Sequence, residues 1–306
     1  MILSLCIHWA IILFFSPLLL GIIGKIKAFF AGRWGSPLLQ SYYDLAKLFR
    51  KNCVYSVTTT WIFRGAPIVS MAAILTAGTF IPMGALKAPV QFWGDALLFA
   101  SLLALARFFM VLAALDTGSS FEGMGASREM TFSCIAELTL FLNFVVLALF
   151  SRSFSLSEMI AGNASYSWQF VGPVLLLVVV SYFLILLVET SRIPVDDPNT
   201  HLELTMIHEV MVLDHSGPDF GFILYGSAIK LFILGSLWVS LVTPFQTQYP
   251  WMNMLLFASG MIGLAVVIGI IESGMARLRL NRVPYLLIGT FVLALLGFII
   301  ALMRGH

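Results

Sequence analysis

Five ionisable residues lie inside otherwise apolar stretches of this 306-residue sequence: Arg107, Glu137, Glu189, Lys230 and Glu272. An isolated carboxylate in hydrocarbon takes up a proton, an isolated amine loses one, and a buried guanidinium costs several kcal/mol. We therefore expect these side chains to face one another or water. Burial and neighbouring charges can bring the pKa of a carboxylate or a lysine toward neutrality, so the set predicts a hydrated path for protons or ions. The competing interpretation is a set of ion pairs that only holds helices together.

A second concentration of polar residues lies at 189–215, "ETSRIPVDDPNTHLELTMIHEVMVLDH". Pro194 and Pro198 exclude a continuous helix, so the preceding helix is predicted to end near Arg192. Broken backbone at membrane depth is tolerated where protein or water covers it, which predicts a polar cavity near the cytoplasmic surface. We treat 190–220 as an acidic cytoplasmic loop. Its carboxylates after Glu189 form a track: Asp196, Asp197, Glu203, Glu209 and Asp214.

Three histidines, His201, His208 and His215, recur every seven residues in this loop. On a helix they would share one stripe, but a separation of two turns is too long for one metal ion and matches no zinc motif. We favour hydrogen bonding within the loop or an interface, with a proton relay as the alternative. No metal site is predicted.

The elements that carry these residues must be membrane helices. Hydrophobic residues make up 60% of the chain and the mean hydropathy is +0.98, which is typical of integral membrane proteins. Runs of about 20 apolar residues are long enough to cross a bilayer, and strand-like alternation is absent. The prediction is a single all-α multipass domain, 1–306. It has about eight spans near 2–24, 66–86, 95–115, 130–150, 169–190, 221–243, 253–275 and 285–303.

The first of these runs is interpreted as a helix and not as a signal peptide. No basic stretch precedes it, its cations Lys25 and Lys27 follow it, and no small-residue cleavage site is evident.

Two of the linkers between the predicted spans have distinctive sequence patterns. Residues 32–52, "GRWGSPLLQSYYDLAKLFRKN", become amphipathic after Pro37 and predict a helix along the cytoplasmic interface. That helix is either a topological anchor or part of a floor for a soluble partner. Residues 116–129, "DTGSSFEGMGASRE", are interpreted as a glycine-containing loop used for close packing or partner contact.

The cations set the predicted orientation. Only Lys87, Arg152 and Arg304 lie on one side of the predicted spans. The opposite side is therefore predicted to be cytoplasmic, with both termini outside, in the cell (inner) membrane. Because the cations serve topology, the net charge of +2 indicates no nucleic-acid partner. The twelve residues on the cytoplasmic side are Lys25, Lys27, Arg33, Lys47, Arg50, Lys51, Arg64, Arg128, Arg192, Arg277, Arg279 and Arg282.

Cysteine usage argues against a redox centre in this chain. Cys6, Cys53 and Cys134 are scattered, with no CxxC pair, whereas iron–sulfur clusters need grouped thiolates. We expect the chain to bind no cofactor of its own.

Several stretches, in order along the whole chain, carry a family resemblance. They are "ARFF", "LDTGSSFEGMGASRE" followed by Glu137, "ETSRIPVDDP", "SGPDFG" and "ESGMARLRL". The chain resembles the multipass membrane subunit of formate hydrogenlyase, hydrogenase-4 and other group 4 [NiFe] hydrogenase complexes, which is related to subunit 1 of respiratory complex I.

The resemblance implies a non-catalytic subunit that docks a peripheral redox arm and starts a proton or sodium path. Implied partners are hydrogenase-like large and small subunits, which carry iron–sulfur clusters and [NiFe], and antiporter-like membrane subunits in the same bilayer. The implied coupling residues are Glu137, Glu189, Arg192, Asp196, Glu203, Lys230 and Glu272. The residues expected in loops or partner contacts are Arg33, Arg107, Asp116, Arg128, Glu129, Asp197, Glu209 and Asp214.

One departure keeps other functions open. Where family members carry a cluster of glutamates, this chain has Asn199 and His201 and a longer spacer before Ser216. A quinone-site subunit 1 of a complex I-like dehydrogenase is one alternative. A stand-alone ion-coupled transporter is another, although no inverted repeat is visible.

Overall fold

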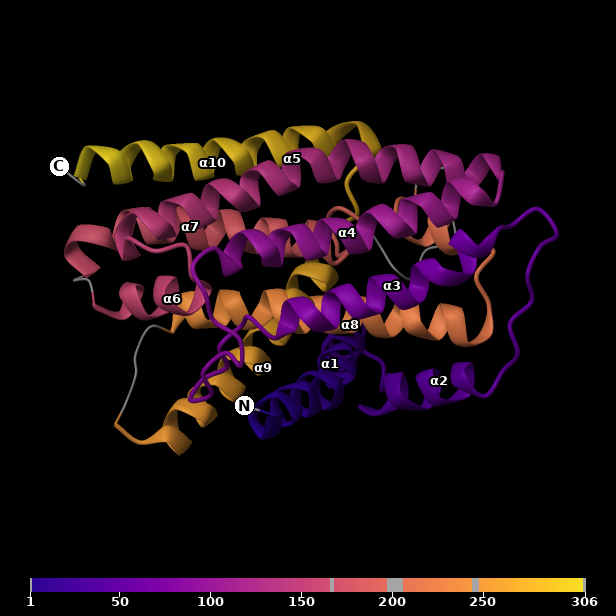
Figure 1. Ribbon diagram of the computed structural model, residues 1–306, viewed down its shortest axis with the longest axis horizontal. Helices are drawn as coiled ribbons and strands as arrows, with labels where there is room; N and C mark the ends of the chain where they lie inside the picture. The colour runs from indigo at the N-terminus through magenta and orange to yellow at the C-terminus, as the bar shows by residue number, and fades with distance from the viewer. Residues whose placement is uncertain (1, 166–167, 197–205, 244–247, 305–306) are drawn as a thin grey trace.

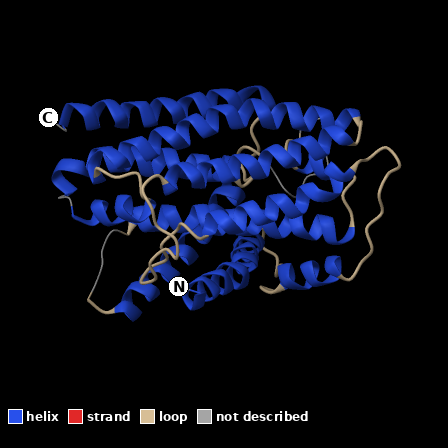
Figure 2. Cartoon of the chain, viewed as in Figure 1, coloured by secondary structure: helices blue, strands red, loops and turns tan. Residues whose placement is uncertain are grey.

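The structure is a computed structural model that describes residues 2–165, 168–196, 206–243 and 248–304. Within these residues the chain is built from helices and connecting loops, and Figures 1 and 2 show the helices running largely along one axis. Eight helices are long and apolar enough to cross a membrane, which confirms the predicted multipass bundle.

The eight long helices have the following bounds: α1 Ile2–Phe30, α3 Trp61–Gly78, α4 Asp95–Asp116, α5 Ser120–Ser151, α7 Trp168–Glu189, α8 Gly217–Val242, α9 Pro250–Gly274 and α10 Val283–Arg304. The shorter elements are α2 Gln40–Phe49, α6 Leu156–Ser165 and the 3-10 turns η1 Glu209–Val212 and η2 Leu280–Arg282. The helix α10 packs on α5 and α7, α3 packs between α4 and α8, and α1 packs on α8 and α9.

The amphipathic helix predicted after Pro37 is α2. It contains no buried residue, and it rests on α1 and α8, where Phe49 meets Phe222 edge to face. An exposed, one-sided helix at the end of a membrane bundle has the properties of an interfacial helix.

Two predicted boundaries were wrong. The second span begins at Trp61 and ends at Gly78, not at 66–86, because Thr60 caps its start and the chain then turns at Pro82 and Gly84, which has a φ of +56°. The loop predicted at 116–129 is largely helical, because α5 begins at Ser120, ten residues before the predicted span.

The first turns of α5 pack closely against the segment after α7. At Gly125 an added Cβ would clash with the side chain of Val210 and would lie 3.1 Å from the carbonyl oxygen of Ile207. The missing side chain lets η1 lie directly on α5, with Val210 and Met211 buried. Close packing, one of the two roles predicted for this glycine-containing stretch, is therefore confirmed at Gly125, whereas an added Cβ at Gly118 or Gly123 would meet nothing within 4 Å.

Candidate functional site

A single guanidinium connects three transmembrane helices inside the bundle. Arg107 of α4 donates through Nη1 to Glu137 of α5, and through Nη2 to both carboxylate oxygens of Glu189 at the end of α7, at 2.5 and 2.6 Å. Its Nε lies 3.1 Å from Glu129 of α5, an ion-pair distance without hydrogen-bond geometry. The side chain of Arg107 is 6% exposed, so these three carboxylates supply its counter-charge.

Two further groups complete this assembly. Lys230 of α8 places Nζ 2.6 Å from Glu189, and His208 places Nδ1 3.0 Å from Glu129. We call the six residues the Arg107 cluster: Arg107, Glu129, Glu137, Glu189, His208 and Lys230. Counted by formal charge, three carboxylates face the cations Arg107 and Lys230, so a proton on His208 makes the sum zero. The formal charge of the cluster therefore changes from zero to minus one when His208 loses its proton.

A second buried carboxylate lies beside the first group. The side chain of Glu272, on α9, is fully buried and pairs with Arg192 at 3.1 Å and with Lys27 of α1 at 2.9 Å. Two cations for one carboxylate leave this group with an excess positive charge. Arg192 follows the end of α7, which ends at Glu189 and so confirms the helix end predicted from the prolines.

The loop after α7 is held against the bundle by Asp196. One oxygen of Asp196 lies 3.0 Å from Nη2 of Arg277, and the other accepts hydrogen bonds from the backbone N–H groups of Ile207 at 3.2 Å and His208 at 3.0 Å. This carboxylate therefore fixes the backbone that carries the His208 imidazole. Asp196 influences the Arg107 cluster by positioning the His208 side chain.

Cavities link this site to the surface. A cavity of about 80 Å³ is lined by Arg107, Glu189, Lys230 and His208, and it has room for several water molecules. A larger cavity of about 390 Å³ lies between α1, α2 and α8, with Lys27 and Glu272 in its wall. Of the described residues that line both cavities, His208 is the one with a titratable side chain.

The structure places the residues predicted from the sequence in separate groups. Glu137, Glu189 and Lys230 lie in the Arg107 cluster. Arg192 forms an ion pair with Glu272, and Asp196 holds the loop that follows α7. Arg107 lies in the bundle interior, as its position inside an apolar stretch predicted, although the family resemblance had also grouped it with the loop and partner contacts. Glu129, which was expected around the loop, lies beside it because the extended α5 carries it into the bundle.

Other predicted contact residues lie apart. Asp116 accepts hydrogen bonds from the backbone N–H and the hydroxyl of Thr60, so it holds the start of α3. Arg128 donates to the carbonyl oxygen of Met206 at 2.8 Å. Arg33 and Asp214 are exposed, and Glu209 lines the larger cavity. Asp197, Glu203 and His201 lie outside the described residues.

Three contributors were missed from the sequence. Lys27 and Arg277 were assigned only to membrane topology, and His208 was assigned to hydrogen bonding within the loop or an interface, with a proton relay as the alternative. Each has a partner more than 75 residues away along the chain. Within the described residues, no group of histidines, cysteines and carboxylates is arranged to hold a metal ion.

His208 makes the site sensitive to pH. Burial disfavours the charged imidazole, but the adjoining Glu129 carboxylate outweighs burial and raises the pKa of His208 above its ordinary 6.5; Lys230 opposes and Asp196 supports protonation. A base with a raised pKa stabilises the fold fully below its unfolded pKa, and this contribution disappears as pH rises through the raised value. We expect the melting temperature of the purified chain to fall as pH rises above 6.5, and His208→Gln to remove that part of the fall.

His215 provides the matched control. Its ring stacks on Phe63 at 3.9 Å, and burial lowers the pKa of His215 to about 4. Its contribution is therefore lost as pH falls below 6.5, the opposite direction. His215→Gln should lower the melting temperature without changing the slope above pH 7. An unchanged slope in His208→Gln would contradict the assignment of His208.

Comparison with known proteins shows the family to which the sequence is related. The family model described as NADH dehydrogenase matches residues 2–303. Formate hydrogenlyase subunit 4 of Escherichia coli (strain K12) is 31% identical over 304 residues, covering 95% of both chains. Hydrogenase-4 component C of the same organism is 32% identical over 279 residues, covering 91% of this chain and 87% of that protein.

A similarity in fold extends the comparison. The structure matches a chain in the solved structure of the membrane-bound sulfane sulfur reductase, an archaeal respiratory membrane complex. The TM-score is 0.84 at 21% identity, over 98% of this chain and 99% of that one. The chain therefore belongs to the NADH dehydrogenase family of complex I subunit 1-like membrane proteins.

Proposed function

We propose that this chain is the membrane-anchoring and coupling subunit of a hydrogenase-like redox complex. It docks a soluble redox arm on its cytoplasmic face and starts a proton or sodium path in the membrane. The observation that carries the proposal is the Arg107 cluster, in which charged groups from α4, α5, α7, α8 and the following loop meet inside the bundle.

The charge balance of the cluster supports a role in proton movement. In a purely structural ion pair the charges of the partners already cancel, and no exchangeable proton is needed. In the Arg107 cluster the net charge is zero or negative according to whether His208 carries a proton. His208 stands between the larger cavity and the buried carboxylates, so it is placed to pass a proton to Glu129. A change in the docked arm that moves the loop around Asp196 would change the proton affinity of the cluster.

The proposal includes partners and orientation. The end that carries α2 and the loop after α7 faces the cytoplasm, and both termini face outside. Between α2 and α3, Val54 and Val57 are exposed apolar residues beside Arg50 and Lys51, a composition suited to a protein contact. The partners are hydrogenase-like large and small subunits that carry iron–sulfur clusters and a [NiFe] centre, and antiporter-like membrane subunits. This chain itself binds no cofactor.

Purification of the tagged chain in mild detergent tests the proposal. We expect large and small hydrogenase-like subunits to co-purify, and substitution of Val54 and Val57 by aspartate to release them while the chain stays in the membrane. Exposed Val90, at the opposite end of α3, supplies the control Val90→Asp. Recovery of the chain alone with ion-transport activity would instead support a stand-alone transporter.

A quinone-site subunit is the second candidate, and the larger cavity favours it. Its wall combines apolar residues such as Leu20, Ile23 and Phe220 with charged ones that include Lys27, Arg192 and Glu272. A volume of about 390 Å³ lies within the range of small-molecule sites. Dependence of redox turnover on added quinone would establish this function, and turnover without quinone would reject it.

A further inference from the structure

Lys230 places a positive charge at a point where the bundle could otherwise hold a small cation. Its Nζ lies 2.6 Å from Glu189, and both residues line the cavity of about 80 Å³. The side chain of Lys230 is 11% exposed, so its ammonium is confined to this wall. Both carboxylate oxygens of Glu189 also accept hydrogen bonds from Nη2 of Arg107. Two cations of the chain itself therefore share this carboxylate.

The rest of the cavity offers oxygen atoms. The hydroxyl residues in its wall are Ser70, Thr190, Ser191 and Ser227. The hydroxyls of Thr190 and Ser227 donate to backbone carbonyl oxygens of the preceding turn at 2.7 and 2.8 Å, and a hydroxyl that donates can still accept through its lone pairs. Small, hard cations such as Na⁺ are bound by oxygen atoms of carboxylates, hydroxyls, carbonyls and water. Without the ammonium, Glu189 and these hydroxyls would form such a ligand set.

The charge of the Arg107 cluster argues against a sodium ion while Lys230 is present. With a proton on His208 the formal charges already sum to zero, so a sodium ion beside Glu189 would give a buried site a net positive charge. Like charges a few Å apart repel much more strongly inside a protein than in water. The tethered ammonium of Lys230 thus keeps free cations away from Glu189.

The cluster without a proton on His208 has too little room for a sodium ion. Its formal charge is then minus one, and the carboxylate oxygen that faces the imidazole belongs to Glu129. The cavity lined by Glu129 and His208 has a volume of about 10 Å³, enough for no more than one water molecule and too small for an ion with its hydration water. A proton needs no such space, because the imidazole nitrogen that carries it lies 3.0 Å from Glu129.

We propose that the ion path in this chain takes protons and excludes sodium ions, and that Lys230 is the residue that sets this selectivity. The proposal rests on the coupling function proposed above, and it selects between the two ions which that function leaves open. Loss of the ammonium would leave the cluster with a formal charge of minus one even when His208 is protonated. A sodium ion held by Glu189 and the nearby hydroxyls would then restore a charge of zero.

The stability of the purified full-length chain in detergent tests the proposal, compared in NaCl and in KCl at equal concentration and at about pH 8, where exposed carboxylates are ionised. The melting temperature of the unmodified chain should be the same in both salts. Lys230→Ala should lower it in KCl, and NaCl should recover about 3 °C, because an ion that binds only the folded chain stabilises it. Lys230→Ser should respond in the same way and replaces the alanine variant if that variant does not fold. Lys230→Arg, which keeps the charge, should show no difference between the salts.

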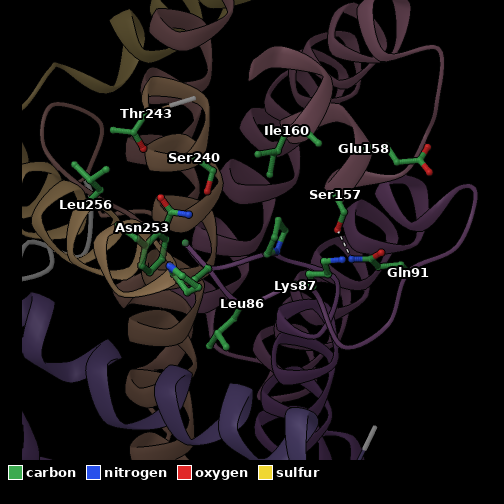
Figure 3. A pocket seen from close by; sticks show the side chains of 16 residues that line it. Leu86, Lys87, Gln91, Ser157, Glu158, Ile160, Ser240, Thr243, Asn253 and Leu256 are labelled. Carbon is green, nitrogen blue, oxygen red and sulfur yellow. Dashed lines mark hydrogen bonds between the residues drawn. The ribbon is translucent and has the colours of Figure 1, made fainter. Parts of the chain in front are cut away.

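Two other lysines that line cavities provide matched controls. Lys27 pairs with the buried Glu272, but Arg192 remains as a partner of that carboxylate, so Lys27→Ala should lower the melting temperature equally in both salts. Lys87 is exposed in the wall of the cavity of about 400 Å³ that Figure 3 shows, which is also lined by the end of α8 and the start of α9. Lys87→Ala should therefore change the melting temperature in neither salt.

Three results would overturn the proposal. The first is stabilisation of the unmodified chain by NaCl relative to KCl. The second is an equal melting temperature in the two salts for both Lys230→Ala and Lys230→Ser, and the third is a response to NaCl in Lys27→Ala as large as that in Lys230→Ala. Because the measurement uses the chain alone, it is independent of the gradient that the complex forms. A normal gradient in Glu189→Gln would reject the coupling function, whereas any of these three results would reject only the choice of ion.

Discussion

Replacing Arg107 with methionine is expected to destabilise the whole bundle. Methionine fills a similar volume but leaves Glu129, Glu137 and Glu189 facing one another with Lys230 as the remaining permanent cation. Removing one partner of a buried ionic group costs about 3–5 kcal/mol, because the charges that remain stay buried without compensation. We expect a lower yield of membrane-inserted protein and a melting temperature lower by on the order of 10 °C, measured by fluorescence-detected size-exclusion chromatography after heating.

Arg152→Met is the matched control for this experiment. Arg152 is exposed at the end of α5, so losing its charge should leave the melting temperature within about 1 °C. Arg107→Lys should fall between the two, because an ammonium keeps the charge but cannot reach three carboxylates with one planar group. If Arg107→Met melted like the unmodified chain, the three carboxylates would not depend on Arg107 for their stability.

Replacing Glu189 with glutamine is expected to abolish coupling while the complex still assembles. The amide keeps the shape and can still accept hydrogen bonds from Arg107 and Lys230, but it removes the charge that both cations share. Without that charge the cluster is formally neutral when His208 carries no proton, so the cluster loses its reason to hold a proton there. Loss of one acid–base group from a transfer step costs on the order of 100-fold in rate, so ion translocation should fall by roughly 100-fold. The measurement is the pH gradient formed by inverted membrane vesicles during redox turnover, normalised to assembled complex.

Asp95→Asn separates this effect from the general cost of changing a buried carboxylate. Asp95 is fully buried at the other end of the bundle, where it accepts hydrogen bonds from the hydroxyl of Ser155 and the backbone N–H of Leu156. It has no contact with the Arg107 cluster, so this variant should lose stability but keep its gradient per complex. A normal gradient in Glu189→Gln would assign the cluster to structure alone.

The eight spans and the presence of buried ionisable residues could be predicted from the sequence. Transfer into hydrocarbon is close to additive along a helix, so apolar length alone identifies a span, and Glu189, Lys230 and Glu272 are conspicuous within such lengths. Helix ends were less predictable. The first turns of α5, from Ser120, include Gly125, which packs against Val210 of another segment, and the local sequence does not reveal that contact.

The partners of those ionisable residues were decided by the tertiary structure. Arg107 and Glu189 are 82 positions apart, and Glu272 meets Lys27 from the other end of the chain. Each pairing depends on how far two helices are rotated and shifted against each other, and packing among all the helices sets those values. Hydropathy contains no information about that rotation. By itself the sequence therefore determined that charges would be buried, and only the packed bundle determined that His208, fixed by Asp196, completes the cluster.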